Sequence, residues 1–171
     1  MNDIESRLRR LEDRSELQDL IVRYFLAADD NDYEALAATF APDAVFSAGG
    51  FMGGRSRAEV VEFIRADRTN NMGVTIHTPN FTLLDFRDAD AATGVIGAHL
   101  ELARGGRTLY GAVRYHDEYA RLDGRWYIKR REMLAIHIGP WEEVGTSLTA
   151  ERRVRWPGAR PSHADLPLWR K

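Results

Sequence analysis

A length of 171 residues, a formal net charge of −2 and the absence of cysteine exclude several classes of protein. The length allows one well-buried core and is too short for two comfortable domains. Without cysteine there are no disulfides, thiolate nucleophiles or thiolate metal sites, and the slight negative charge gives no electrostatic basis for binding nucleic acid or an anionic membrane.

The N-terminal segment MNDIESRLRRLEDR is charged throughout and has no apolar core of the kind found in signal peptides. No apolar run in the chain approaches the roughly 20 residues that span a bilayer. We therefore expect neither a signal peptide nor a transmembrane segment, and a cytoplasmic protein.

Residues 3–29 have the periodicity of an amphipathic helix. Several apolar residues fall on one broad arc of the helical wheel, namely Leu17, Leu20, Ile21, Tyr24, Phe25 and Ala28. Asp29 lies at the margin of this arc, where partial burial and the negative end of the helix dipole predict a raised pKa. Such a carboxylate is a candidate base or a partner for a cationic ring, although DDND is also typical of a polar helix stop.

The segment after this helix predicts a short helix, a strand and a turn. Asn31 or Asp32 is placed to cap a helix through NDYEALAATF. AVFSA is then typical of a strand, and GGFMGG of a glycine-rich turn that ends at Gly54.

A third helix is predicted over 56–68, because Ser56 and Glu59 have the spacing of a capping box. From Gly73 onward the pattern changes to that of strands, with RGGR and LDGR as good hairpin turns. Four runs are predicted, at 74–86, 92–104, 108–121 and 125–138. Helices followed by a long antiparallel meander indicate an α+β fold.

The tail from Gly139 loses this periodicity and is rich in proline, tryptophan and arginine. Because tryptophans are rarely left in water without a partner, we interpret the tail as an extended arm on the surface, with a neighbouring subunit as one place for it. The chain is thus expected to form a single domain over 1–138, with an arm of the same domain over 139–171.

His77 is the unusual residue of the first predicted long strand, GVTIHTPNFTLLDF. Either it is a hydrogen-bonded core histidine, or it transfers protons near neutral pH. The other histidines show neither HxH nor HExxH spacing, so we expect no metal site. Whether His99 joins the site is left open.

The last strand, WYIKRREML, carries three cations in an apolar context. Alternation places Arg130 and Glu132 on one face and Arg131 on the other, so one of the two arginines should point inward unless a bulge intervenes. A buried arginine needs an anionic partner, for which Asp29 or a developing substrate oxyanion are candidates. Alternatively, Arg130 and Glu132 form a solvated pair and Arg131 lines the sheet edge.

Taken together, these segments resemble the SnoaL-like branch of the NTF2-like superfamily. The resemblance covers about residues 10 to 138 and is carried by ELQDLIVRYFLAADDNDYEALAATFAPDAVF, RAEVVEFI, HTPNFTLLDF and YARLDGRWYIKRR. DGRWYI after a strand and FAPDAVF after a helix are its most specific pieces. It implies a cone-shaped α+β barrel, in which a curved, mostly antiparallel sheet packs on three N-terminal helices around a deep apolar pocket.

Lyases of this family include scytalone dehydratase, lindane dehydrochlorinase and bile-acid dehydratase. They place an aspartate at the end of the first long helix and a histidine on the strand after the third, positions at which Asp29 and His77 stand here. Tyr24 matches a tyrosine of the bile-acid enzyme, and Arg131 an arginine of the dehydrochlorinase. Tyr24 also replaces the lysine of the dehydrochlorinase, which makes halide elimination less expected.

The resemblance predicts a cofactor-independent lyase. His77 would remove a proton next to an activating group, while Asp29 orients its ring and stabilises the imidazolium. Tyr24 would hydrogen-bond the leaving group or a carbonyl, and Arg131 would stabilise developing negative charge. We expect loss of water, or of a small fragment such as formaldehyde, from a hydrophobic aromatic or polycyclic substrate. Three other aromatic residues are expected to bind it: Tyr110, Tyr115 and Phe25.

Two other functions stay open. An isomerase of the ketosteroid type would use a base and an acid donor in the same pocket. A non-catalytic ligand-binding or scaffold subunit, like the β-subunits of ring-hydroxylating dioxygenases, would hold Asp29 and His77 apart or fill the pocket with side chains. The resemblance also implies a homo-oligomer, with a trimer favoured, and a small hydrophobic substrate.

Overall fold

Three helices precede a meander of four long strands in the computed structural model, which describes residues 3–166 apart from the side chains of 71 and 72. The elements are, in order, α1 (Asp3–Asp29), α2 (Tyr33–Thr39), β1 (Phe40–Ala48), β2 (Phe51–Gly54), α3 (Arg57–Asn71), β3 (Met72–Phe86), β4 (Ala91–Arg104), β5 (Arg107–Leu122), β6 (Arg125–Pro140), a 3-10 turn (Trp141–Glu143) and α4 (Val144–Ser147). No helix in the described part of the chain is long and apolar enough to cross a membrane.

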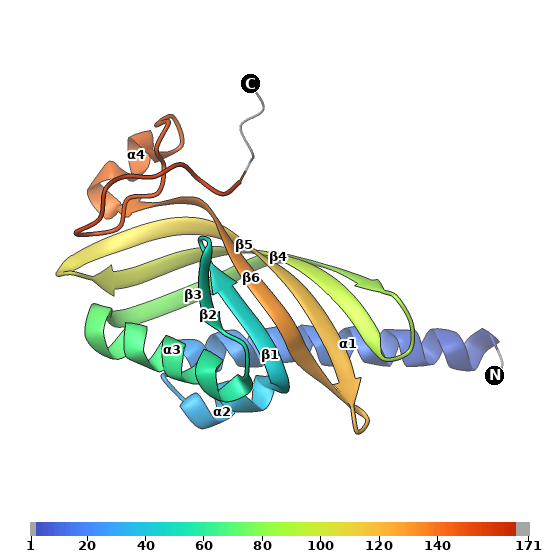
Figure 1. Cartoon of the computed structure of the whole chain (residues 1–171). Helices are drawn as coiled ribbons and strands as arrows, with labels where there is room; N and C mark the ends of the chain where they lie inside the picture. The colour runs from blue at the N-terminus through green and yellow to red at the C-terminus, as the bar shows by residue number, and fades with distance from the viewer. Residues whose placement is uncertain (1–2, 167–171) are drawn as a thin grey trace.

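The strands form one curved sheet in the order β2-β1-β6-β5-β4-β3. Neighbours are antiparallel except for β1 and β6, which run parallel. Helices α1, α2 and α3 cover one face of the sheet (Figure 1). The predicted α+β class is confirmed, and the expected barrel is an open sheet with β2 and β3 at its edges.

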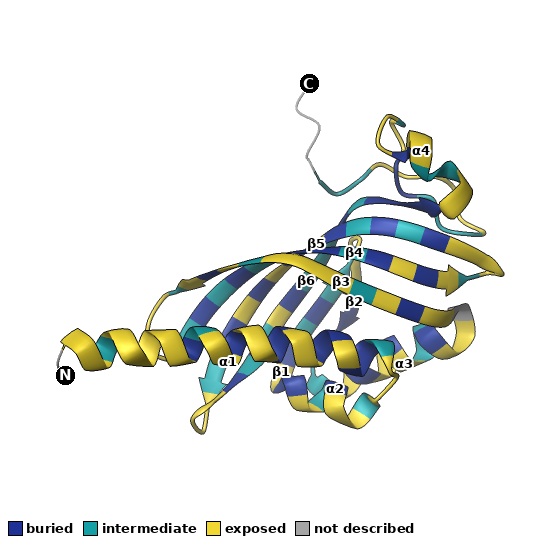
Figure 2. Ribbon diagram, turned by 180° about the vertical axis from the view of Figure 1, so that it is seen from behind, coloured by how far each residue is buried: buried dark blue, intermediate teal, exposed yellow. Residues whose placement is uncertain are grey.

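The core lies between the helices and the concave face of the sheet. Leu17 and Ile21 of α1, Leu36 of α2 and Phe40 of β1 pack there with Ile128 of β6, all almost fully buried. The N-terminal part of α1 extends beyond the sheet and is largely exposed (Figure 2). The C-terminal half of α1 therefore carries the packing, and this half ends at Asp29.

The helix cap and the hairpin turn predicted from the sequence are largely found in the structure. Asp32, rather than Asn31, caps α2 by accepting a hydrogen bond from the backbone of Ala35 at 2.9 Å. In the β5–β6 hairpin Asp123 and Gly124 both have positive φ, as a two-residue turn of the favoured hand requires. The segment expected to be wholly a turn is corrected, because Phe51–Gly54 pairs with β1 as strand β2.

Bulges decide which side chains of the long strands face inward. On β6 the register against β5 shifts at Lys129, so that Ile128 and Arg131 both point into the core. On β3 the register against β4 shifts at Asn80. Because this bulge lies between them, His77 and Leu84 both face the helices. Simple alternation along either strand would have placed these pairs on opposite faces.

The C-terminal segment folds back onto the subunit that carries it. Strand β6 continues to Pro140, and Val154 then bridges to Ile138 and Ser162. The backbone nitrogen of Asp165 donates to Ala135 at 2.9 Å. Of the predicted arm, the part up to residue 166 is thus built onto β6, whereas residues 167–171 lie outside the described residues.

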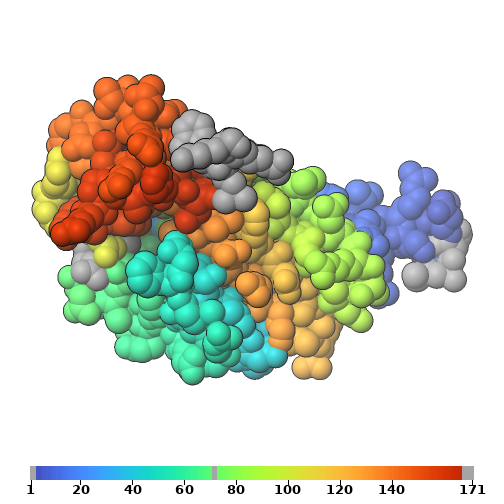
Figure 3. All heavy atoms as spheres, turned by 45° about the horizontal axis from the view of Figure 1, so that its top comes forward, coloured from blue at the N-terminus to red at the C-terminus, as the bar shows by residue number. Residues whose placement is uncertain are grey.

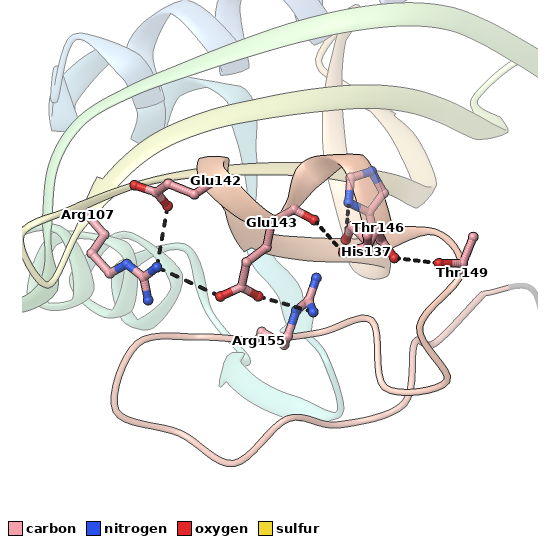
Figure 4. A network of polar contacts seen from close by, with 8 residues as sticks. Arg107, His137, Glu142, Glu143, Thr146, Thr149 and Arg155 are labelled. Atoms are coloured by element: carbon pink, nitrogen blue, oxygen red, sulfur yellow. Dashed lines mark hydrogen bonds and ion pairs between the residues drawn. The ribbon is translucent and has the colours of Figure 1, made fainter.

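An ionic network fixes the start of this segment (Figure 4). Arg107, at the beginning of β5, lies 3.4 Å from Glu142 and 3.8 Å from Glu143. Glu143 in turn pairs with Arg155 at 3.1 Å. These contacts hold the turn after β6 and the returning strand segment together.

Candidate active site

Asp29 and His77 are in direct contact. Asp29 is the last residue of α1, and its Oδ1 lies 2.5 Å from Nδ1 of His77 on β3. The other carboxylate oxygen accepts the backbone N–H of His77 at 2.8 Å. Two hydrogen bonds to one residue fix the carboxylate relative to the ring, and Phe25 stacks on that ring at a centroid distance of 5.0 Å.

The hydrogen bonds that Asp29 accepts determine its charge state. Burial alone would raise the pKa of Asp29, but hydrogen bonds from His77 and Thr75 more than offset this and lower it below its usual value. The raised pKa predicted from the sequence is therefore wrong, because helix-end burial is outweighed by donors that the sequence did not reveal. An ionised carboxylate only accepts, so Nδ1 of His77, which faces it, carries a proton.

A cavity of about 640 Å³ opens beside this pair. Its lining is mostly apolar, a size and character typical of sites for small organic molecules. The inner wall is formed by side chains of α1, α3 and the strands, among them Tyr24, Phe46, Ile64, His77, Leu100, Tyr115 and Met133.

Arg68 is a cavity residue that the sequence reasoning missed. It lies in the last turn of α3 yet is only 7% exposed, and its Nη1 donates to Oγ1 of Thr75. Its Nη2 is 3.9 Å from Oδ1 of Asp29. The signal was available, since Val60, Ile64 and Arg68 are spaced by four residues and so share one face of the helix.

Arg131 lies behind the cavity wall and not on its surface. It is fully buried and forms a two-pronged ion pair with Asp117 on β5, at 2.9 Å and 2.6 Å. The partner of Arg131 is thus neither Asp29 nor a substrate oxyanion, the two candidates named from the sequence. Asp117 follows Tyr115 in the inward series of β5 and meets Arg131 across the ladder. Burial would lower the pKa of Arg131, but Asp117 raises it, so the guanidinium stays charged.

Tyr24 and Tyr115 separate Arg131 from the cavity. The guanidinium stacks on both rings, with its carbon 3.9 Å from the Tyr24 centroid and 4.9 Å from that of Tyr115. Burial raises the pKa of both tyrosines, and Arg131 only partly opposes this at Tyr24. Each hydroxyl thus stays protonated and can donate a hydrogen bond to a bound molecule.

Two of the predicted substrate-binding residues lie elsewhere. Phe25 is buried under the ring of His77, where it positions the imidazole. Tyr110 is on the convex face of the sheet, where it stacks with His99 at 5.4 Å and contacts Trp141 at 5.6 Å. Side chains alternate between the two faces of β5, so Tyr110 points away from the face that carries Tyr115. Neither Tyr110 nor His99 belongs to the cavity wall.

The C-terminal segment supplies one wall of the cavity, which the sequence did not predict. Trp156 stacks under the guanidinium of Arg104 at 4.9 Å, and Arg104 pairs with Asp67 of α3 at 3.1 Å. The wall continues through residues 157–159 to His163. In Figure 3 this segment lies over the end of the molecule formed by β1, β2 and α3. Within residues 3–166, no three acidic or histidine side chains are grouped to hold a metal ion.

Comparisons with known proteins agree with this architecture. The SnoaL-like domain family matches residues 9–132, and no curated protein matches in a comparison of sequences. The solved structure of LinA is 24% identical, with a TM-score of 0.77 over 81% of this chain and 96% of its own. Hexachlorocyclohexane dehydrochlorinase LinA type 2 is 22% identical, with a TM-score of 0.75 over 89% and 99%.

A scytalone-dehydratase-like protein from Novosphingobium aromaticivorans is 19% identical, with a TM-score of 0.71 over 89% of this chain and 97% of its own. At such identities the structural likeness concerns the fold, whereas the family match concerns the sequence itself. That match spans most of the chain, from α1 into β6. The chain therefore belongs to the SnoaL-like family of the NTF2-like superfamily.

Proposed function

We propose that this protein is a lyase that eliminates water, or another small neutral fragment, from a hydrophobic aromatic or polycyclic substrate. The observation that carries the proposal is the 2.5 Å contact between Asp29 and His77 at the wall of a cavity of about 640 Å³. A carboxylate that fixes one ring nitrogen and leaves the other free is the arrangement of a general base. The named dehydrochlorinase and scytalone-dehydratase-like structures share this fold and support the class of reaction.

In the proposed reaction, Nε2 of His77 takes a proton from a carbon of the substrate. The electrons of that C–H bond form a new C=C bond, and the bond from the next carbon to its hydroxyl group breaks. The imidazolium, stabilised by Asp29, returns the proton to the departing hydroxyl, which leaves as water. Tyr24 donates a hydrogen bond to the leaving oxygen, and Arg131 holds the tyrosines in place from behind. No step requires a cofactor.

Replacing the two central residues tests the proposal. We expect Asp29→Asn and His77→Gln each to lower kcat/KM by about 10²- to 10⁴-fold, the usual contribution of general acid–base catalysis. The assay measures loss of water from a panel of hydroxylated aromatic and steroid-like compounds. Asp19→Asn, on the exposed face of α1, and His116→Gln, exposed on β5 and outside the cavity, are the matched controls.

Product analysis separates the alternatives. A shifted double bond with no loss of a fragment would indicate an isomerase in place of a lyase. If the protein binds the panel without turnover, and Asp29→Asn and His77→Gln bind it equally well, the protein would be a ligand-binding subunit. The open cavity and the contact between Asp29 and His77 argue against that last function.

A further inference from the structure

Arg68 is the arginine that the cavity brings next to the proposed base. Its side chain is 93% removed from solvent, yet it belongs to the cavity lining. Its Nη2 faces the same oxygen of Asp29 that Nδ1 of His77 contacts. A single carboxylate oxygen thus positions an imidazole and a guanidinium side by side.

The contacts of Arg68 leave part of its hydrogen-bonding capacity unused. A guanidinium has five N–H donors, and in the described part of the chain Thr75 alone accepts a hydrogen bond from it. The 3.9 Å separation from Asp29 gives electrostatic attraction but is too long for a hydrogen bond. The two oxygens of Asp29 are already held by His77 at 2.5 Å and 2.8 Å. Donors of Arg68 therefore remain for a bound molecule.

The other two arginines near the cavity are committed to carboxylates. Arg131 is paired twice with Asp117 and is shut off behind Tyr24 and Tyr115. Arg104 lies 3.1 Å from Asp67 at the C-terminal wall. Among the described arginines that line the cavity, only Arg68 is buried and has its carboxylate partner beyond hydrogen-bond distance.

We propose that Arg68 is a catalytic residue that donates a hydrogen bond to a substrate oxygen on which negative charge develops. This inference rests on the proposed function and names its substrate class, a carbonyl compound with a hydroxyl group on the β carbon. A planar, permanently charged donor placed beforehand is the group that stabilises such an oxygen best. Hydrocarbons without an oxygen at that position gain nothing from it.

His77 removes the proton from the carbon next to the carbonyl group, and the C–H electrons move into a C=C bond while the carbonyl oxygen becomes an enolate oxygen held by Arg68. The enolate then re-forms the carbonyl, the double bond forms between the α and β carbons, and the bond to the β hydroxyl breaks. The proton on His77 goes to that hydroxyl, and water leaves.

Binding of a stable anion tests the role of Arg68 without turnover. The probes are 2-naphthoate and its neutral counterpart 2-naphthalenemethanol, with Kd measured by calorimetry on the whole chain. We expect wild type to prefer naphthoate by at least tenfold and Arg68→Gln to weaken naphthoate binding by about 10- to 100-fold, with little change for the alcohol. Arg68→Lys, which keeps the positive charge but lacks the planar pair of N–H donors, should give an intermediate Kd. Arg114→Gln, exposed on β5 and outside the cavity lining, should change it less than threefold.

Catalysis is read by exchange of the α hydrogens of 2-tetralone in D₂O, followed by NMR. Wild type should exchange them, and both Arg68→Gln and His77→Gln should slow exchange by at least tenfold. Equal affinity of wild type for naphthoate and the alcohol, or undiminished exchange in Arg68→Gln, would overturn the inference, and the first of these needs no variant. If naphthoate binding follows Arg68 while His77→Gln retains full elimination activity, the proposed base fails and the anion site stands.

Discussion

A buried ion pair and a reactive pair lie close together in this protein, and their residues differ in what surrounds them. Asp117 and Arg131 form a two-pronged ion pair in a fully buried position, and Tyr119 adds a hydrogen bond to Asp117 at 2.5 Å. Asp29 and His77 are 18% and 11% exposed, and His77 lines the cavity. The first pair therefore serves the packing of the sheet, and the second remains accessible to a bound molecule.

Breaking the buried pair of Asp117 and Arg131 should lower the stability of the protein. Asp117→Asn leaves the guanidinium of Arg131 buried without a counter-charge, so we expect the free energy of unfolding to fall by about 3–5 kcal/mol. Urea denaturation measures it. Asp43→Asn, which breaks the exposed pair with Lys129, should cost less than about 1 kcal/mol. A loss for Asp117→Asn as small as that of Asp43→Asn would contradict this account.

At the scale of elements, the attachment of α4 to β6 depends on a neutral histidine. Nδ1 of His137 lies 3.2 Å from the hydroxyl of Ser147, with both residues buried. Burial, together with the charges of His99, Arg153 and Arg155, lowers the pKa of His137. The neutral ring is thus a structural part of the C-terminal segment.

This attachment predicts a specific pH dependence. Below the ordinary histidine pKa of about 6.5 the unfolded chain binds a proton that the folded chain does not, so stability falls as the pH drops below that value. We expect wild type to melt at a lower temperature at pH 5.5 than at pH 7.5. His137→Gln should show a smaller difference, whereas His116→Gln, exposed on the same sheet face, should behave as wild type does. An undiminished difference in His137→Gln would refute the role of this ring.

Element types were predictable from the sequence, but the bulges were not. Hydrophobic periodicity is a local property, so it placed α1, α3 and the four long strands within a few residues. The bulge at Lys129 arises from pairing with β5, and nothing in WYIKRREML announces it. It determines that Arg131 joins Ile128 on the inward face, which is why its partner could not be named in advance.

At the scale of the whole molecule, apolar side chains remain uncovered along edge strand β3. Val74, Phe81 and Leu83 are 71%, 51% and 58% exposed, and Leu26 on α1 is 57% exposed. We propose that subunits associate over this surface and expect light scattering to give three times the chain mass. Leu83→Lys should lower that mass, and Leu122→Lys, at the β5–β6 hairpin, should not. A monomer for wild type would refute association and leave the chemistry untouched.

The site itself was predictable only in part, for reasons of topology. The sequence resemblance paired Asp29 with His77, and the structure brings the two together. Helical spacing placed Arg68 on the same face of α3 as Val60 and Ile64, but it did not show that this face borders a cavity. Trp156 was missed because the cavity is made by segments far apart in the chain. The tail has no periodic pattern in its sequence, so its packing back onto Ala135 and Ile138 could not be predicted.

The wall formed by Trp156 and its neighbours has a consequence for biosynthesis. It follows β6 in the chain, so a ribosome completes all six strands before this part of the pocket emerges. A nascent polypeptide can therefore acquire its sheet and its core while the pocket still lacks one side. Substrate capture would be the last property acquired during translation, and clipping by a protease after Pro140 would remove it from an otherwise folded protein.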